Sequence, residues 1–300
     1  MSTSSPLTLA SRQHSKKPRM LVVDDERDNL DLLFRTFRRE FKVLKAESGT
    51  EALEILASEG EVAVIISDQR MPEMKGTEFL SKTVPDFPDT VRIILTGFTD
   101  VEDLVEAINA GEVYRYITKP WDPNELKGVV DQASSTYQML KGQIAELHNA
   151  ERQSKMMTVV GQIAAQSMQK EEALQYLTHG FGEILNADVC TLLLSVDGSV
   201  GHYGLVDVEK VSTCKLVTDA IASQQSQALT ALQSEDTLAS EPLYTDGTQC
   251  HLAIPVVYQG ETLGAFSFQW KTPHHALADV SHLLGLIAPQ VALSLKAAVL

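Results

Sequence analysis

Five side chains suited to phosphoryl transfer each end or follow an apolar run near the start of the chain. They are Asp24 and Asp25 after LVV, Asp68 after VIIS, Thr96 after RIIL and Lys119 after YRYIT. Carboxylates brought together repel one another unless a cation neutralises them. Mg²⁺ takes oxygen ligands, keeps several waters, and is satisfied by one or two carboxylates plus a substrate phosphate. These residue types therefore predict a site for magnesium-assisted phosphoryl transfer.

Charge assigns a role to each residue of this site. Asp68 is the expected nucleophile, since a carboxylate that attacks phosphorus forms an acyl phosphate. Mg²⁺ and Lys119 would carry the charge of the transferring group, so that catalysis is mostly positioning and electrostatics. Thr96 can donate a hydrogen bond to a phosphate oxygen only once the phosphate is present. It is therefore expected to detect the modification, which adds about two negative charges.

Alternating strand and helix patterns must position these residues. Strands are expected at MLVVD, FKVLKA, VAVIISD, VRIILTG and VYRYITK, and helices at NLDLLFRTFRR, GTEALEILAS, GTEFLSKTV, VEDLVEAINA and PNELKGVVDQ. Five strands that alternate with helices predict an α/β fold with a doubly wound parallel sheet, and continuous apolar strands fit burial on both faces. Ligands of such sheets bind beyond the carboxyl ends of the strands. The five side chains fall at that edge.

The runs LVVDDE, VIISDQRMPEMKG, IILTG and YRYITKPW, in this order, resemble the receiver domain of two-component response regulators over residues 19–132. The resemblance implies a five-stranded, CheY-like and flavodoxin-like fold. It also implies a phosphoryl group accepted from a histidine kinase or phosphotransfer protein, with Mg²⁺ as cofactor. By position, Asp68 is then the phosphoacceptor and Asp24 and Asp25 are the acidic metal pair.

The same resemblance assigns further residues. The backbone carbonyl of Arg70 would be a metal ligand together with the three carboxylates. Thr96 would be the switch hydroxyl and Tyr116 the switch aromatic, while Pro120 would follow a cis peptide bond. Lys75 departs from the pattern, because MPxMxG commonly carries an acidic residue there.

A long helix is expected after the fifth strand. Its apolar positions step alternately by four and three, the spacing of a coiled-coil seam, and are Leu126, Val130, Ala133, Tyr137, Leu140, Ile144 and Leu147. Glu151 interrupts the pattern, which resumes in a shifted phase. We expect residues 133–168 to form a coiled-coil-like linker that joins two chains in a homodimer. An amphipathic helix folded back on its own domain is the alternative.

Residues 169–300 have an α+β pattern and are similar to a GAF domain. The similarity lies in FGEILNADVCTLLL and in LAIPVVYQGETLGAFSF, an expected hairpin that turns at Gln259-Gly260. A helix is expected at VSTCKLVTDAIAS, and a closing helix with a kink or restart at Pro289. GAF domains bind small ligands or dimerise. The chain is thus expected to signal through a protein partner, or alternatively to sense a small molecule whose action the receiver adjusts.

The segment GQIAAQSMQKE is similar to the stretch around the phosphorylated histidine of sensor kinases, but Gln169 stands where that histidine would be. No glycine-rich ATP motif follows it. A degenerate kinase-like regulator therefore stays an alternative, and no separate catalytic output is expected.

Composition excludes several classes of protein. The net charge is −15, and both halves are acidic, with 13 basic and 23 acidic residues at 19–125 and 5 and 14 at 165–300. This charge disfavours binding to nucleic acid. Three single cysteines indicate reduced thiols rather than disulfides. Residues 1–18 read as a disordered tail, and no apolar run suggests a membrane span. We expect a soluble, cytoplasmic protein.

Overall fold

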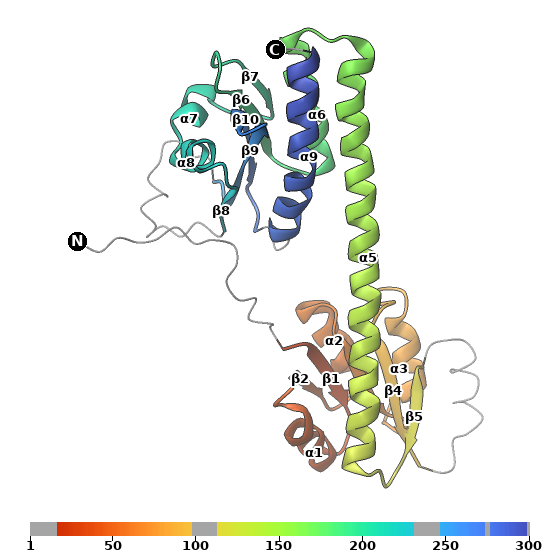
Figure 1. The fold of residues 1–300 in the computed structure, drawn as a ribbon. Helices are drawn as coiled ribbons and strands as arrows, with labels where there is room; N and C mark the ends of the chain where they lie inside the picture. Colours follow the sequence, from red (N-terminus) through yellow and green to blue (C-terminus); the bar gives the residue numbers. More distant parts are fainter. Residues whose placement is uncertain (1–16, 98–112, 231–246, 274–276, 299–300) are drawn as a thin grey trace. The chain divides into compact units, whose positions relative to one another are not determined.

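The computed structural model describes residues 17–97, 113–230, 247–273 and 277–298. The chain forms two compact units, residues 1–146 and 147–300. Each unit is built around its own sheet, and both sheets can be followed by their labels in Figure 1.

The N-terminal unit contains a parallel sheet of five strands. The strands are β1 (Arg19–Val23), β2 (Lys42–Ala46), β3 (Val64–Asp68), β4 (Val91–Thr96) and β5 (Arg115–Thr118). Their order is β2-β1-β3-β4-β5, and every neighbouring pair is parallel. This is the doubly wound sheet predicted from the sequence. The helix expected at VEDLVEAINA lies outside the described residues.

Helices cover both faces of this sheet, as the apolar strands require. They are α1 (Arg27–Phe37), α2 (Gly49–Glu59), α3 (Gly76–Thr83) and the start of α5 (Pro123–Gln166). One core contains Phe37 of α1 and Val130 of α5, and the other contains Leu56 of α2 and Phe79 of α3. The sheet is therefore fixed between two apolar layers, and its carboxyl edge is free to carry polar side chains.

Helix α5 begins at a capped end and continues for 44 residues. The Asp122 side chain accepts hydrogen bonds from the backbone N–H groups of Asn124 and Glu125, at 2.8 and 3.1 Å. Pro123 stands at the first helical position, where its missing N–H costs nothing. The helix ends before Ser167, whose φ of +49° is not helical.

The expected coiled-coil seam along α5 is corrected in its first half. Leu126, Val130 and Ala133 are fully buried in the core of their own unit, and Tyr137 packs against that core. The alternative of a helix folded back on its own domain therefore holds for these residues. The period of four and three does not distinguish a partner helix from a sheet, because both bury one stripe. Beyond residue 138 the apolar residues of the stripe are exposed to solvent. Leu140 and Ile144 are each 38% exposed, and Leu147 is 68% exposed.

The C-terminal unit contains an antiparallel sheet in the order β7-β6-β10-β9-β8. Its strands are β6 (Val189–Leu194), β7 (Val200–Tyr203), β8 (Gln227–Leu229), β9 (Cys250–Tyr258) and β10 (Glu261–Trp270). The β9–β10 hairpin was predicted and is confirmed. Gln259 and Gly260 have φ values of +49° and +85°, as in a type I′ turn, whose twist matches that of the strands.

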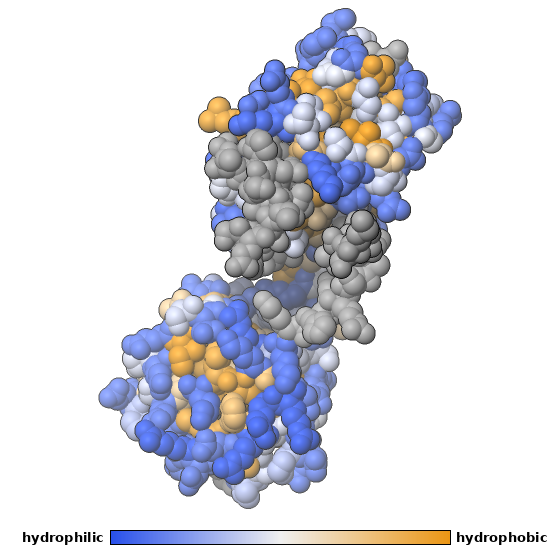
Figure 2. Space-filling view, turned by 90° about the vertical axis from the view of Figure 1, so that its left-hand side faces the viewer, coloured by the Kyte–Doolittle hydropathy of each residue, from blue (hydrophilic) through white to orange (hydrophobic). Residues whose placement is uncertain are grey.

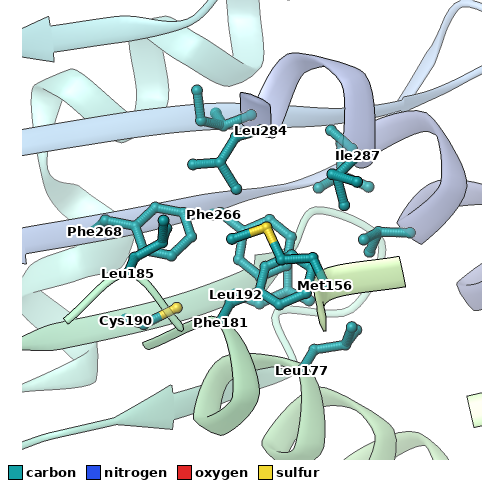
Figure 3. Packing of buried hydrophobic residues seen from close by; sticks show 14 of the residues in the cluster. Met156, Leu177, Phe181, Leu185, Cys190, Leu192, Phe266, Phe268, Leu284 and Ile287 are labelled. Carbon is teal, nitrogen blue, oxygen red and sulfur yellow. The ribbon is translucent and has the colours of Figure 1, made fainter. Parts of the chain in front are cut away.

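Two helical layers enclose this sheet. Helices α6 (Lys170–Ile184) and α9 (Leu277–Ala298) and the end of α5 pack on one face, and α7 (Val208–Thr213) and α8 (Lys215–Ser223) on the other. Figure 3 shows Met156 of α5 beside Phe181 of α6 and Phe266 of β10. The Phe181 and Phe266 rings stack with centroids 5.2 Å apart. Cys190, Cys214 and Cys250 are buried and form no disulfide among the described residues.

One expectation for the C-terminal helices is corrected. The single helix expected at VSTCKLVTDAIAS is divided between α7 and α8, because Cys214 is extended, with ψ of 127°. Helix α9 continues through Pro289, where at most a kink or a restart was expected. Residues Leu277–Ala297 are also long and apolar enough to cross a membrane by length and composition, which the sequence interpretation missed. Leu284 and Ile287 of this helix nevertheless belong to the core in Figure 3.

The surface of each unit is mixed in character. Figure 2 shows hydrophilic residues over much of the visible face of both units, with apolar areas among them. Such a surface is ordinary for a folded protein, whose polar residues cannot cover all of it.

Candidate phosphoacceptor site

The parallel strands bring four of the five predicted side chains to one edge. Asp68 and Thr96 are the last residues of β3 and β4, while Asp24 and Lys119 directly follow β1 and β5. The strand register pairs Asp68 with Leu95, so Thr96 lies one position beyond the partner of Asp68. The backbone N–H of Lys119 donates to the Thr96 carbonyl at 2.7 Å. The carboxyl edge of the sheet thus has the composition that the sequence predicted.

The Lys119 ammonium stands between two carboxylates. Its Nζ is 3.1 Å from Oδ2 of Asp24 and also contacts Oδ1 of Asp68. Asp24 and Asp68 are 1% and 7% exposed, whereas the Lys119 side chain is 30% exposed. A buried carboxylate is costly unless it is paired and hydrogen-bonded. Lys119 therefore stabilises both acids at once.

Asp24 is held by two further donors. Asn29 Nδ2 lies 3.1 Å from each Asp24 carboxylate oxygen, and the backbone N–H of Glu26 donates to Oδ1 at 2.9 Å. Asn29 lies in the first turn of α1, so the helix start fixes the orientation of the acid. The sequence interpretation missed Asn29. The sequence could have indicated it, because Asn29 lies in the first turn of the helix that follows Asp24 and Asp25.

Asp68 combines burial with charged neighbours. The backbone N–H of Arg70 donates to its Oδ2 at 2.6 Å. Burial raises the pKa of the Asp68 carboxyl, and the hydrogen bond and charge of Lys119 oppose only part of that effect. Burial alone would lower the pKa of Lys119, but its contacts with Asp68 and Asp24 outweigh this and raise it. Asp68 and Lys119 thus shift one another's pKa through the contact between their charged groups.

Three predicted residues are exposed. Asp25 and Arg70 face solvent, and Tyr116, on the edge strand β5, is 44% exposed. Within the part of the chain that the structure describes, no three His, Cys, Asp or Glu side chains stand together as a metal-binding group. Asp24 and Asp68 instead meet around Lys119. The peptide bond before Pro120 is cis, as the resemblance implied.

A tight loop after Asp68 joins β3 to α3. A Cβ built on Gly76 would lie 2.2 Å from the backbone oxygen of Asp68, so only glycine allows this approach. The Gly76 N–H donates to the Gln69 carbonyl at 3.0 Å, and the Gln69 side chain accepts from the N–H of Thr77 at 3.1 Å. Gly76 and Gln69 thus hold the backbone beside the acid. Neither role was predicted, although Gly76 belongs to the MPEMKG run.

Two families match this chain. Residues 20–131 match the response regulator receiver domain, and residues 169–295 match the GAF domain. A chemotaxis protein CheY homolog of Campylobacter jejuni is 34% identical over 122 residues, which cover 39% of this chain and 93% of that protein. The chain therefore belongs to the response regulators, with an N-terminal receiver domain and a C-terminal GAF domain.

Other relatives are longer or structurally characterised. The hydrogenase transcriptional regulatory protein HoxA of Cupriavidus necator is 35% identical over 229 residues, 75% of this chain, which spans 46% of that regulator's length. The HoxA protein of Bradyrhizobium diazoefficiens is 40% identical over 123 residues, 41% of this chain and 25% of its own length. A crystal structure of an adenylate cyclase from Rhodopirellula baltica is 34% identical, covers 44% of this chain and 97% of its own, and has a TM-score of 0.43.

Replacing Gly76 by alanine tests the close approach at the site. We expect Gly76→Ala to destabilise the protein by about 1–3 kcal/mol, because a crowded backbone must shift to admit the methyl group. Gly128→Ala on α5 is the matched control, since its Cβ meets no atom within 4 Å. That change should be neutral or stabilising by up to about 1 kcal/mol, because glycine is unfavourable inside a helix. Urea unfolding followed by circular dichroism measures both, and equal midpoints for the two variants would contradict the assignment.

Proposed function

We propose that this response regulator accepts a phosphoryl group on Asp68 from a histidine kinase or phosphotransfer protein. The observation that carries the proposal is the pair of buried carboxylates, Asp24 and Asp68, that share the Lys119 ammonium at the carboxyl edge of the sheet. Such an edge is where parallel sheets bind ligands. The site has a nucleophile, a fixed cation and a hydroxyl donor, which are the groups that phosphoryl transfer requires.

The charge of the site fits a bound Mg²⁺. Asp24, Asp25 and Asp68 carry three negative charges against the single charge of Lys119, so a divalent ion would neutralise the remainder. The negative charge of Asp24 also raises the pKa of Asp68, as expected where acids crowd together. We infer that the three carboxylates and the backbone carbonyl of Arg70 would hold the ion. When bound, Mg²⁺ neutralises charge on the transferring phosphoryl group.

The chain's own residues then have distinct tasks in the transfer. A carboxylate oxygen of Asp68 attacks phosphorus and forms a P–O bond, while the bond to the donor's leaving group breaks. The leaving group retains the electron pair and takes a proton from water. The Arg70 N–H orients the carboxylate through its hydrogen bond to Oδ2. Lys119 would move its contact from the free carboxylate to the new phosphoryl oxygens.

Signal output is proposed to begin at Thr96 and Tyr116. Thr96 is buried beside the acid, and its hydroxyl donates to the Gly97 carbonyl at 2.9 Å. A phosphoryl oxygen is a stronger acceptor and could redirect that hydroxyl. Tyr116 lies on β5, whose register places it opposite Ile94, two positions before Thr96. Its exposed ring is free to change position when Thr96 does.

We propose that two chains associate through the exposed part of α5. Leu140, Ile144 and Leu147 are exposed apolar residues spaced four and three apart on α5. A second copy of the same helix is the partner that the spacing fits. On this proposal residues 19–132 are the receiver, 133–168 the linker and 169–300 the GAF module. The acidic charge favours a protein partner in the cytoplasm over nucleic acid, although the HoxA relatives are named transcriptional regulators.

A small molecule bound by the GAF module is the second candidate function. The face of its sheet towards α7 and α8 carries buried polar side chains. Among the residues that the structure describes, Thr191 Oγ1 and Gln269 Nε2 have no hydrogen-bond partner, which is costly unless a ligand or water satisfies them. His251 Nε2 lies 2.7 Å from Ser267 Oγ, and burial lowers the pKa of His251 to about 3, which favours a neutral imidazole there. Native mass spectrometry of the purified chain, which would detect a retained neutral ligand, separates this candidate from a purely protein-binding module.

The kinase-like alternative has less support. Helix α5 ends at Gln166, and Gln169 is the residue that precedes α6, so the GQIAAQSMQKE segment is not one continuous helix. Gln169 has no imidazole to carry a phosphoryl group. We therefore propose no enzymatic activity beyond phosphorylation of the chain's own Asp68.

The first prediction concerns the acceptor. Acetyl phosphate with Mg²⁺ should phosphorylate the chain once, with a base-labile and acid-stable bond, as measured by intact mass. Asp68→Asn should take up no phosphate, because it has no carboxylate nucleophile. Asp25→Ala should lose the Mg²⁺-dependent phosphorylation, because it removes an oxygen ligand of the metal. Label that persists in Asp68→Asn, or full labelling of the wild type in EDTA, would remove the central claim.

The second prediction concerns the switch residues. Thr96→Ala and Tyr116→Ala should accept phosphate on Asp68 yet show a weaker structural response, because both residues read the phosphoryl group without forming it. Hydrogen exchange of β5 and the start of α5, with and without beryllofluoride, measures the response. A wild-type response in either variant would show that this residue is not part of the switch.

The third prediction concerns dimer formation. Leu140→Asp with Ile144→Asp should give a monomer by light scattering, because two charges in an apolar seam cost several kcal/mol if they stay buried. The variant should still be phosphorylated on Asp68, whose pocket it does not touch. Leu32→Asp is the control, since Leu32 is an exposed apolar residue on α1. A monomeric wild type at micromolar concentration would refute the seam.

A further inference from the structure

Lys141 of α5 is bound by the N-terminal unit at two points. Its Nζ lies 2.9 Å from Oε2 of Glu61 and 2.7 Å from Oδ2 of Asp89. The side chains of Glu61 and Asp89 are only 27% and 21% exposed, so these pairs are better shielded than ordinary surface ion pairs. Lys141 is the last half-buried residue of α5 before a run of exposed positions from 142 to 148.

Tyr137, one turn earlier on α5, completes the cluster. The Lys141 ammonium lies over the Tyr137 ring, 5.6 Å from its centre. Burial raises the pKa of Tyr137, and the charge of Glu61 and a hydrogen bond to it add to the effect. Burial alone would lower the pKa of Lys141, but its hydrogen bonds to Asp89 and Glu61 raise it well above the ordinary value. These contacts therefore favour the charged form of Lys141.

The two carboxylates belong to the strands that carry the phosphoacceptor site. Glu61 precedes β3 by three residues, and β3 ends at Asp68. Asp89 precedes β4 by two residues, and β4 ends at Thr96. Strands β3 and β4 are hydrogen-bonded neighbours. Each strand therefore joins a residue of the site at its carboxyl end to a partner of Lys141 at its amino end.

We propose that Lys141 couples the state of Asp68 to α5, by holding the helix to β3 and β4 together. A single ammonium can satisfy both carboxylates only while the starts of the two strands keep their present separation. A displacement of one strand relative to the other, caused at the site, weakens one of the pairs. Among the described residues, no ion pair joins the part of α5 beyond Lys141 to this unit, so the attachment of the helix changes at that point. The inference rests on the proposed phosphorylation of Asp68.

Alternative roles for the cluster are distinguished by their consequences. If Lys141 only anchored the helix, its loss would speed hydrogen exchange in α5 equally in the phosphorylated and unphosphorylated states. The difference in exchange between these two states would then remain. If Lys141 couples the site to α5, its loss removes that difference. The experiment must therefore compare the two states within each variant.

Hydrogen exchange of the full chain tests the proposal, with peptides covering residues 138–150 measured with and without beryllofluoride and Mg²⁺. In the wild type we expect beryllofluoride to change the amide exchange rate of these residues by about threefold or more. That factor corresponds to the free energy of a partly shielded ion pair. In Lys141→Met, which keeps the apolar stem, exchange should be fast in both states and the difference should be lost. Asp89→Asn, which leaves one carboxylate, should reduce the difference.

Two controls make the outcome decisive. Lys141→Arg should restore the response, because a guanidinium can bridge two carboxylates. Lys155→Met should keep the wild-type response, since Lys155 pairs only with Glu151 of the same helix. A wild-type difference in Lys141→Met would overturn the coupling, as would an unresponsive wild type that is phosphorylated on Asp68. A chain that takes up no phosphate from acetyl phosphate would instead refute the proposed function.

Discussion

The placement of one ammonium between two buried carboxylates is the constraint on which the receiver depends. Burial raises the pKa of Asp68 and the charge of Asp24 adds to the effect, while the hydrogen bond and charge of Lys119 oppose both. The cation directly follows β5, while the acids follow β1 and end β3, so three strands must be in register for Lys119 to reach both acids. The strand register that forms the sheet is therefore also what brings the residues of the site together.

The sequence predicted this part of the protein well because the relevant signals are local. Strands β1, β3 and β4 are mainly apolar, and Asp24, Asp68 and Thr96 end or directly follow them. Asn29 and Gly76 were missed because their roles depend on contacts across a loop, with Asp24 and with the backbone of Asp68. Neither hydrophobic periodicity nor amino-acid composition indicates such a contact. The division of α7 from α8 at Cys214 was missed for a similar reason, since no proline or glycine marks it.

Helix α5 shows where periodicity alone is insufficient. Its first apolar residues, such as Val130, pack on the sheet of their own unit, and only the later ones, such as Ile144, are available to a partner. An apolar stripe has the same spacing in both cases. Lys141 lies where α5 passes from residues that pack on the sheet to exposed residues. Its partners, Glu61 and Asp89, are far from it in the sequence, so the sequence pattern did not indicate this contact. One helix thus combines a domain element with a linker.

The buried thiols bear on how this protein can be studied. Cys190, Cys214 and Cys250 are all enclosed, and burial raises the pKa of Cys190 well above its usual range. Alkylating reagents attack the thiolate, so enclosed neutral thiols react slowly. A cysteine introduced at an exposed position of α5 would then be the preferred target for a fluorophore or spin label. The native cysteines can stay in place, and the interior of the GAF domain is left unaltered while the linker is observed.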